Sequence, residues 1–157
     1  MSIIELVTET AQLFKKNHWK LAVAESCTGG GLAYQLTSIP GSSEWFDRGF
    51  VTYSNSAKQD MLGVSLSTLE KFGAVSQETA QEMAEGALRH SQANIAIAIT
   101  GVAGPGGGTA EKPVGTVCIA WSSANAQTVA QLYHLTGDRK AIRQQSIQLA
   151  LQGLLIR

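Results

Sequence analysis

The chain has 157 residues, of which 44% are hydrophobic and only 15% charged, and its formal net charge is zero. Because this length fits one compact domain and the charged fraction lies well below the roughly 25% of an average globular protein, we expect a single domain over residues 1–157 that buries much strand or hides surface in an oligomer. The sequence has no basic run, which argues against binding of nucleic acid.

Metal binding, secretion and membrane insertion find no support. Cys27 and Cys118 lack metal-ligand spacing and the three histidines are scattered, so we expect no metal. Two cysteines that do not form a pattern typical of disulfide-bonded proteins indicate a reducing compartment. The first residues are acidic where a signal peptide needs basic ones, and no apolar run reaches membrane-spanning length. We therefore expect a cytoplasmic protein.

Helices and strands alternate in the first part of the chain. Hydrophobic periodicity predicts a helix over residues 1–16, a strand over 20–26, a helix over 28–39, a strand over 45–54 and a helix over 55–62. Pro40-Gly41 would end the second helix, and Ser54 or Asn55 would cap the third.

The later part begins with the clearest helix, residues 76–92, which Ser76 can cap. A strand over 94–104, two strands over 115–123 and 127–137, and a final helix from residue 139 behind Asp138 follow. The short turn between the two neighbouring strands makes them antiparallel, whereas strands separated by helices favour a parallel arrangement. We therefore predict an α/β protein, a three-layer α/β/α sandwich with a mixed, mostly parallel sheet.

Three segments follow predicted strand ends, where ligands bind in open sheets: residues 25–30, 53–58 and 100–108. In the first, glycines after Ser26 and Cys27 let the backbone approach an anion closely at a helix start. Their spacing fits neither a Walker A loop nor a dinucleotide fingerprint. A strand–helix turn that only packs tightly explains this segment equally well. Glu25 receives no chemical role, and orientation of this loop is the role left open for it.

The second segment places Lys58 in the first turn of a helix, where the helix dipole opposes a cation. A neutral lysine there would accept a proton from a serine, although a solvated Lys58 beside a packed Tyr53 is the structural alternative. No histidine lies in the three segments to activate a cysteine, and Ser–Lys pairs are a known variant of serine catalysis. We therefore favour Ser26 as the nucleophile, with Cys27 packed behind it.

The third segment ends a strand at Thr100 and Gly101, and the glycines after them offer backbone donors to an oxyanion or a phosphate. Residues 106–112 are better explained as a surface loop. Arg139 at the start of the last helix would neutralise a phosphate, although such basic residues are usually solvated. The candidate substrate-binding residues are Thr28, Gly29, Gly30, Asn55, Thr100, Gly101 and Arg139.

Four motifs occur in a fixed order: "AESCTGG", "RGFVTYSNSAK", "GAVSQETAQEMA" and "AITGVAGPGGG". Together they resemble the C-terminal domain of the CinA family, a competence- and damage-inducible family, from about residue 5 to the end of the chain. The chain begins at a methionine, so it resembles the single-domain form without the molybdopterin-binding-like domain of longer relatives. Arg48 stands where the family usually has glycine.

The resemblance implies a nicotinamide-nucleotide amidase that uses no cofactor. Its reaction would convert nicotinamide mononucleotide to nicotinate mononucleotide and ammonia in pyridine-nucleotide salvage. The family's serine, tyrosine and lysine fall on Ser26, Tyr53 and Lys58. A homo-oligomer, most simply a dimer, is also implied. The competing interpretation is a nucleotide- or phosphate-binding module without turnover, because the same glycine loops would serve it.

Overall fold

The computed structural model describes all residues, 1–157. Its elements are α1 (Ile3–Asn17), β1 (Leu21–Glu25), α2 (Gly31–Leu36), a 3₁₀ helix (Ser42–Glu44), β2 (Phe46–Val51), α3 (Asn55–Leu62), α4 (Leu66–Phe72), α5 (Gln77–Arg89), β3 (Ile95–Gly101), β4 (Thr116–Ser123), β5 (Ala126–His134) and α6 (Arg139–Leu155). None of these helices combines the length and the apolar character needed to cross a membrane.

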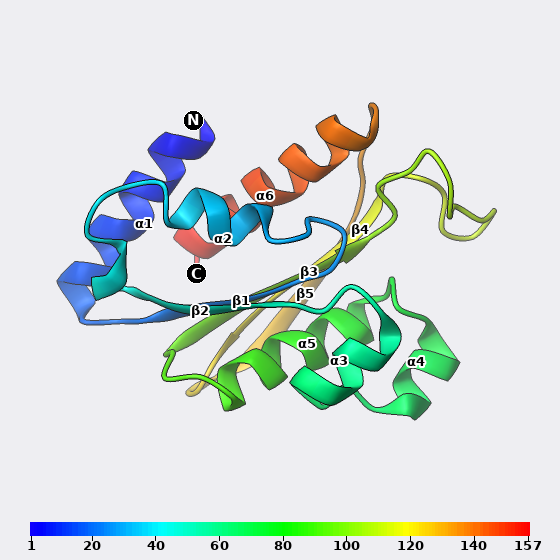
Figure 1. The fold of residues 1–157 in the computed structure, drawn as a ribbon, viewed down its shortest axis with the longest axis horizontal. Helices are drawn as coiled ribbons and strands as arrows, with labels where there is room; N and C mark the ends of the chain where they lie inside the picture. The colour runs from blue at the N-terminus through cyan, green and yellow to red at the C-terminus, as the bar shows by residue number, and fades with distance from the viewer.

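The sheet has five strands in the order β2-β1-β3-β4-β5. Strand β1 pairs in parallel with β2 and β3, whereas β4 is antiparallel to both β3 and β5. Only β4 therefore runs against the other strands. Helices α1, α2 and α6 cover one face, and α3, α4 and α5 cover the other (Figure 1). The predicted three-layer sandwich with a mixed sheet and a closing antiparallel hairpin is confirmed.

Every residue of β1 is buried, and successive side chains enter different core clusters. Leu21 and Val23 pack with α1, α2 and α6, whereas Ala22 and Ala24 pack with α5. This alternation follows from the geometry of an extended strand. The alternation continues to the end of the strand and one residue beyond it. The Glu25 side chain is hydrogen-bonded to the backbone of α2, and the Ser26 side chain to Lys58 of α3. The two faces of the sheet thus receive adjacent polar residues.

Two helices differ from the sequence predictions. Helix α2 begins only at Gly31, because Gly29 and Gly30 have φ angles of 58° and 96° and form a left-handed turn before it. Helix α4 was not predicted; it has seven residues, too few to display a helical hydrophobic period. The Ser65 side chain accepts a hydrogen bond from Thr68 N and starts this helix, a signal that the sequence carried.

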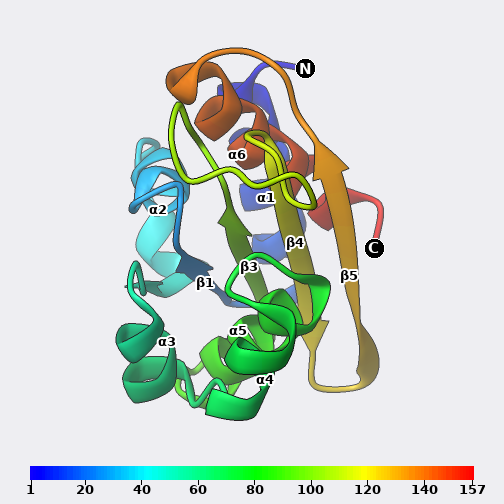
Figure 2. The same ribbon diagram turned by 90° about the vertical axis from the view of Figure 1, so that its right-hand side faces the viewer.

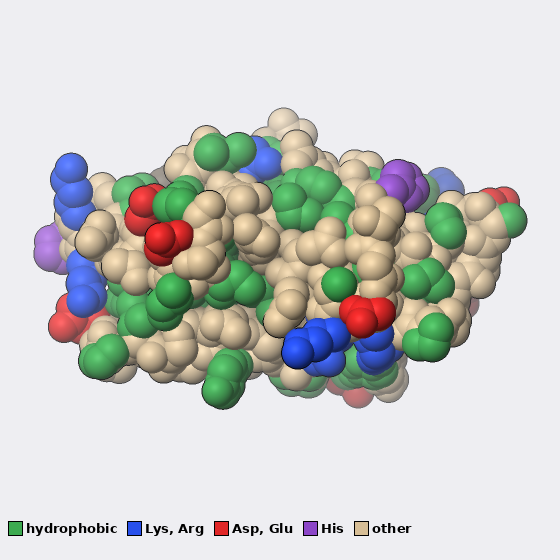
Figure 3. All heavy atoms as spheres, turned by 90° about the horizontal axis from the view of Figure 1, so that it is seen from above, with side chains coloured by type: hydrophobic (Ala, Val, Ile, Leu, Met, Phe, Trp, Pro, Cys, Tyr) green, Lys and Arg blue, Asp and Glu red, His purple; other side chains and the backbone are tan.

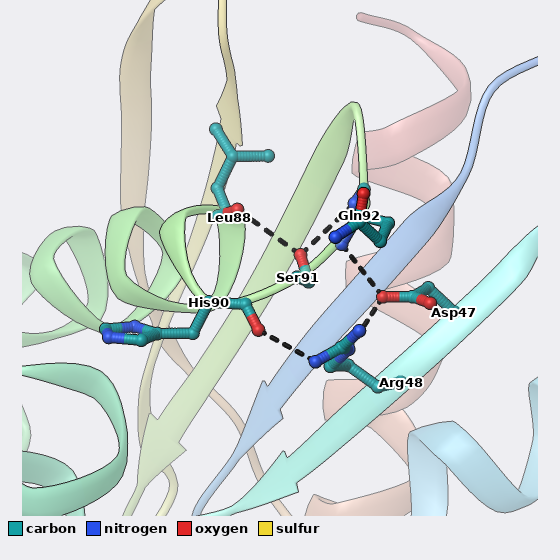
Figure 4. Close-up of polar contacts among 7 residues, drawn as sticks. Asp47, Arg48, Leu88, His90, Ser91 and Gln92 are labelled. Atoms are coloured by element: carbon teal, nitrogen blue, oxygen red, sulfur yellow. Dashed lines mark hydrogen bonds and ion pairs between the residues drawn. The ribbon is translucent and has the colours of Figure 1, made fainter.

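Arg48, the departure from the family pattern, lies early in β2 and ties that strand to the turn between α5 and β3 (Figure 4). Its Nε lies 2.7 Å from Asp47 Oδ2, and its Nη1 donates to the His90 carbonyl oxygen over 3.0 Å. The Gln92 N–H completes the group by donating to Asp47 Oδ2. The departure therefore affects a structural connection at the opposite end of β2 from residues 53–58.

The low charge of the sequence is visible on the surface. Lys and Arg side chains are scattered over the face formed by α1, α2 and α6 and do not gather into a patch there (Figure 3). The Arg48–Asp47 contact is the only ion pair between side chains. Ion pairs between side chains therefore contribute little to stability.

Gly86 in α5 provides a test of how closely α3 and α5 pack. A Cβ atom there would lie 2.0 Å from the Leu62 carbonyl oxygen at the end of α3. Gly86→Ala is expected to push the helices apart and lower the free energy of unfolding by about 1–3 kcal/mol, as overpacking does. Urea denaturation measures this. Gln81→Ala, at an exposed position of α5, is the control; equal effects of both substitutions would contradict the close contact.

Candidate active site

A cavity of about 290 Å³ lies at the carboxyl ends of β1 and β3. Of the predicted site residues, Ser26, Tyr53, Lys58, Thr100, Gly101 and Arg139 all line it. They come from four separate parts of the chain. The loop of residues 102–115 passes beside the start of α6 and contributes a further wall (Figure 2). The three segments that the sequence singled out therefore meet at one end of the sheet.

Lys58 lies on the first part of α3, whose start is capped by the Ser54 side chain. The lysine is only 1% exposed, and no carboxylate pairs with it. Its Nζ lies 3.1 Å from Ser26 Oγ, 3.0 Å from the Thr52 carbonyl oxygen and 3.2 Å from the Tyr53 carbonyl oxygen. Burial lowers the pKa of Lys58, because an apolar environment disfavours the ammonium form.

The three neighbours of Nζ match the hydrogen-bonding capacity of a neutral amine. Such an amine has two N–H donors and one lone pair. Backbone carbonyl oxygens can only accept hydrogen bonds, so the carbonyls of Thr52 and Tyr53 take the two N–H groups. The lone pair is then left for Ser26, whose hydroxyl can either donate or accept. The same site satisfies an ammonium group, which would donate to all three oxygens.

Tyr53 takes part in this group through its backbone. Its carbonyl oxygen accepts a hydrogen bond from Lys58 Nζ and lies 3.4 Å from Ser26 Oγ, whose single hydrogen is given either to this carbonyl or to the lone pair of a neutral Lys58 amine. The side chain is 62% exposed, and its hydroxyl accepts a hydrogen bond from Arg139 Nη2 over 3.3 Å. The hydroxyl makes no hydrogen bond to Ser26 or Lys58. The tyrosine ring thus borders the mouth of the cavity.

Ser26 and Cys27 occupy different environments although they are neighbours. Ser26 is 8% exposed and contacts the Lys58 amine, whereas Cys27 belongs to the apolar cluster with α1, α2 and α6. Burial raises the pKa of the Cys27 thiol to about 11. Because the thiolate is the reactive form of cysteine, Cys27 is poorly suited to act as a nucleophile near neutral pH.

Arg139 and two other predicted residues belong to the cavity wall. Arg139 Nη1 donates to the Gly104 carbonyl oxygen over 2.8 Å, which joins α6 to the 102–115 loop. Thr100 Oγ1 donates to the Ala74 carbonyl oxygen. At Gly101 a Cβ would meet Val117 Cγ2 at 2.8 Å, so this position has no room for a side chain.

The remaining predicted binding residues do not line the cavity. Thr28 is fully buried and its hydroxyl donates to Glu25 Oε1, so its side chain is used within the protein. Gly29 and Gly30 form the turn before α2, and Asn55 is an exposed residue at the start of α3. None of these four approaches the cavity through a side chain.

Sequence reasoning missed two residues that hold the turn after Ser26. The buried Glu25 carboxylate accepts hydrogen bonds from α2, and Arg143 Nη2 donates to the Thr28 carbonyl oxygen. Glu25 was detectable, because a carboxylate at the end of an apolar buried strand needs donors, and the nearest ones are at the following helix start. Arg143 lies four residues after Arg139, on the same side of a predicted helix.

No group of three or more His, Cys, Asp and Glu side chains is arranged to hold a metal ion. The polar groups that face the cavity are hydroxyls, one amine, one guanidinium and backbone atoms.

Comparison with known proteins identifies relatives over nearly the whole chain. The model of the CinA C-terminal domain matches residues 4–157. A nicotinamide-nucleotide amidohydrolase PncC from Enterobacter agglomerans is 48% identical over 151 residues, which cover 96% of this chain and 92% of that protein. A CinA-like protein from Syntrophobacter fumaroxidans is 54% identical over 137 residues, 87% of this chain but 32% of that longer protein.

A solved structure agrees with the fold as well. The crystal structure of the competence/damage inducible protein CihA from Agrobacterium tumefaciens has a TM-score of 0.95 and 48% sequence identity. The match covers 98% of this chain and 94% of that one.

Because burial lowers the pKa of Lys58 below that of an exposed lysine, the stability of the protein should depend on pH in a specific way. Above that pKa the folded protein has a neutral Lys58, whereas the unfolded chain keeps the proton up to about pH 10.4. The unfolded state then binds more protons, so the stability of the wild type relative to Lys58→Met should rise with pH over this interval. Urea denaturation of both proteins across this range measures the difference. A difference that stays constant with pH would contradict a lowered pKa.

Proposed function

This chain belongs to the CinA C-terminal domain family, and on that premise we propose that it is a nicotinamide-nucleotide amidase. It hydrolyses the carboxamide of nicotinamide mononucleotide and releases nicotinate mononucleotide and ammonia. One observation carries the proposal: the amine of Lys58, buried without a carboxylate partner, lies 3.1 Å from the Ser26 hydroxyl at the wall of a cavity. The name of the relative that matches over nearly its full length supports the choice of substrate.

The first step transfers the Ser26 proton to neutral Lys58. The lone pair that the Thr52 and Tyr53 carbonyls leave free accepts this proton while Ser26 Oγ forms a bond to the amide carbon. The resulting ammonium donates to three oxygens that are already in place. The charge that develops on the amine is therefore stabilised without movement of the backbone.

The amide oxygen becomes an oxyanion and needs donors beside Ser26. The backbone N–H groups of Cys27, Thr28 and Gly30 have no acceptor within the protein. The same is true of Ala103 and Gly104 on the facing loop. We assign the oxyanion to the N–H of Cys27, the first residue of the turn after Ser26, because Cys27 lines the cavity and a donor next to the nucleophile lies closest to the new bond.

Release of ammonia and hydrolysis of the acyl-enzyme complete the reaction. Lys58 returns its proton to the amide nitrogen as the carbon–nitrogen bond breaks, and ammonia leaves. Water then attacks the acyl carbon, Lys58 accepts the water proton, and Ser26 Oγ recovers a proton as its bond to carbon breaks. Tyr53, at the mouth of the cavity, positions the group through its carbonyl oxygen.

The phosphate of the substrate is assigned to the mouth of the cavity. Arg139 lies there and has no carboxylate partner. Its guanidinium is always charged and suits a phosphate. The glycine-rich loop that Arg139 contacts at Gly104 adds backbone donors.

A nucleotide- or phosphate-binding module without turnover is the alternative. It would need the cationic mouth and the glycine loops but no buried amine against a hydroxyl. A lysine buried without a carboxylate partner lowers the stability of the fold. Such unfavourable placements are common at catalytic sites, where the side chain is needed for the reaction. The amidohydrolase relative also favours the enzyme. The expected homo-oligomer stays a prediction.

Ser26→Ala is expected to abolish ammonia release, because the acyl-enzyme cannot form. Binding of nicotinamide mononucleotide should remain close to that of the wild type, since the hydroxyl is a small part of the cavity wall. Cys27→Ala should retain most activity. Ammonia release and isothermal titration calorimetry measure the two properties. An inactive Cys27 variant together with an active Ser26 variant would reverse the assignment.

Lys58→Arg is expected to be inactive, because a guanidinium stays protonated at every working pH and cannot accept the Ser26 proton. In the wild type, kcat/KM should fall as pH decreases through the lowered pKa of Lys58, since protonation removes the base. Both are measured by ammonia release over a pH series. Near-normal activity of Lys58→Arg would exclude this lysine as the base.

A further inference from the structure

We propose that Glu25, next to the nucleophile, is a positioning residue that holds the oxyanion donors of the turn after Ser26. This inference rests on the amidase reaction proposed above. Glu25 touches neither the substrate cavity nor Lys58. It acts through the backbone that it fixes, from the face of the sheet opposite to the one where Lys58 lies.

The Glu25 carboxylate is almost completely enclosed, with 1% of the residue exposed. No lysine, arginine or histidine pairs with it. Three donors satisfy it instead: Thr28 Oγ1 at 2.6 Å and Leu32 N at 2.8 Å, both to Oε1, and Ala33 N at 3.0 Å to Oε2. A buried charge is costly unless such donors are held in place, so the carboxylate and the turn fix each other.

The donors belong to the two ends of a single turn. Thr28 precedes the left-handed residues Gly29 and Gly30, and Leu32 lies in the first turn of α2. Helix α2 has no side-chain cap of its own, because its N-cap residue is Gly30. Glu25 therefore replaces the missing cap from the preceding strand and sets the distance between strand end and helix start.

The fixed turn leaves particular N–H groups free. Within it, Gly29 N donates to the Ser26 carbonyl oxygen over 3.0 Å and Gly31 N donates to that of Thr28 over 2.9 Å. The N–H groups of Cys27, Thr28 and Gly30 have no protein acceptor. Arg143 Nη2 donates to the Thr28 carbonyl oxygen from α6, so Thr28 is held at both its hydroxyl and its carbonyl.

Glu25 and Ser26 share a peptide unit but face opposite layers. The Glu25 carbonyl oxygen accepts a hydrogen bond from Thr52 N over 2.8 Å, and Ser26 N donates one to the Ile99 carbonyl oxygen over 3.0 Å. These backbone hydrogen bonds, to Thr52 directly after β2 and to Ile99 of β3, do not involve the carboxylate and hold the strand end without it. Loss of the carboxylate should therefore disturb the turn and its free N–H groups while Lys58 and Ser26 stay in contact.

Glu25→Gln tests the proposal. Both carboxylate oxygens of Glu25 accept hydrogen bonds, so the amide nitrogen of glutamine would face an N–H or O–H donor and that hydrogen bond would be lost. We expect kcat to fall about ten- to a hundredfold, less than the 10²–10³ for removal of a whole oxyanion donor. KM should stay within about threefold, and the acid limb of the pH profile should not move. Thr28→Val, which removes one donor to Glu25, should lower kcat in the same direction and serves if Glu25→Gln does not fold.

Glu82→Gln is the matched control. The Glu82 carboxylate accepts a hydrogen bond from Ser65 N over 2.9 Å and contacts the Thr68 hydroxyl. It therefore holds the start of α4 as Glu25 holds the start of α2, but it lies outside the cavity wall. This substitution should lower stability and leave kcat unchanged. Three results would overturn the proposal: an unchanged kcat in Glu25→Gln, an equal fall in Glu82→Gln, or an acid limb shifted toward the ordinary lysine pKa.

Hydrogen–deuterium exchange separates this proposal from the reaction itself. In Glu25→Gln the hydrogen-bonded amides of Gly29, Gly31, Leu32 and Ala33 should exchange at least tenfold faster than in the wild type, whereas those around Lys58 should not change. A wild type that releases no ammonia would refute the amidase reaction. Unchanged exchange of these four amides would refute the positioning role whether or not ammonia is released.

Discussion

Lys58 is buried without a carboxylate to pair with, and the backbone around it is arranged to satisfy that one amine. The carbonyl oxygens of Thr52 and Tyr53 and the hydroxyl of Ser26 are its neighbours, at 3.0 to 3.2 Å. Enclosure in an apolar environment favours the neutral form, and two carbonyls fix the direction of its lone pair. This arrangement supports the proposed role of Lys58 as the base that accepts the Ser26 proton.

The sheet provides this arrangement through the alternation of β1. Its alternate residues feed two separate cores, so the polar residues at its end are directed to different helical layers. Ser26 meets Lys58 of α3 on one side, and Glu25 holds the start of α2 on the other. The proposed nucleophile, base and backbone donors thus lie at one strand end and in the two helices that flank it.

The sequence predicted the layers, the mixed sheet and the convergence of three segments, because long periodic elements and strand ends leave clear patterns. It did not reveal that Tyr53 contributes its carbonyl rather than its hydroxyl, since which backbone group a lysine reaches depends on the path of the chain after β2. Helix α4 was too short to give a period. The role of Glu25 depends on a left-handed turn at Gly29 and Gly30, which glycine permits but does not specify.

Burial lowers the pKa of Lys58, which makes its amine available as a base, and direct observation of its titration tests this. Heteronuclear NMR with labelled lysine follows the Nζ and Cε resonances of all lysines against pH, and Lys58→Met assigns the one that disappears. We expect Lys58 to titrate at a lower pH than the exposed lysines. A Lys58 resonance that titrates together with the exposed lysines, near pH 10.4, would contradict it.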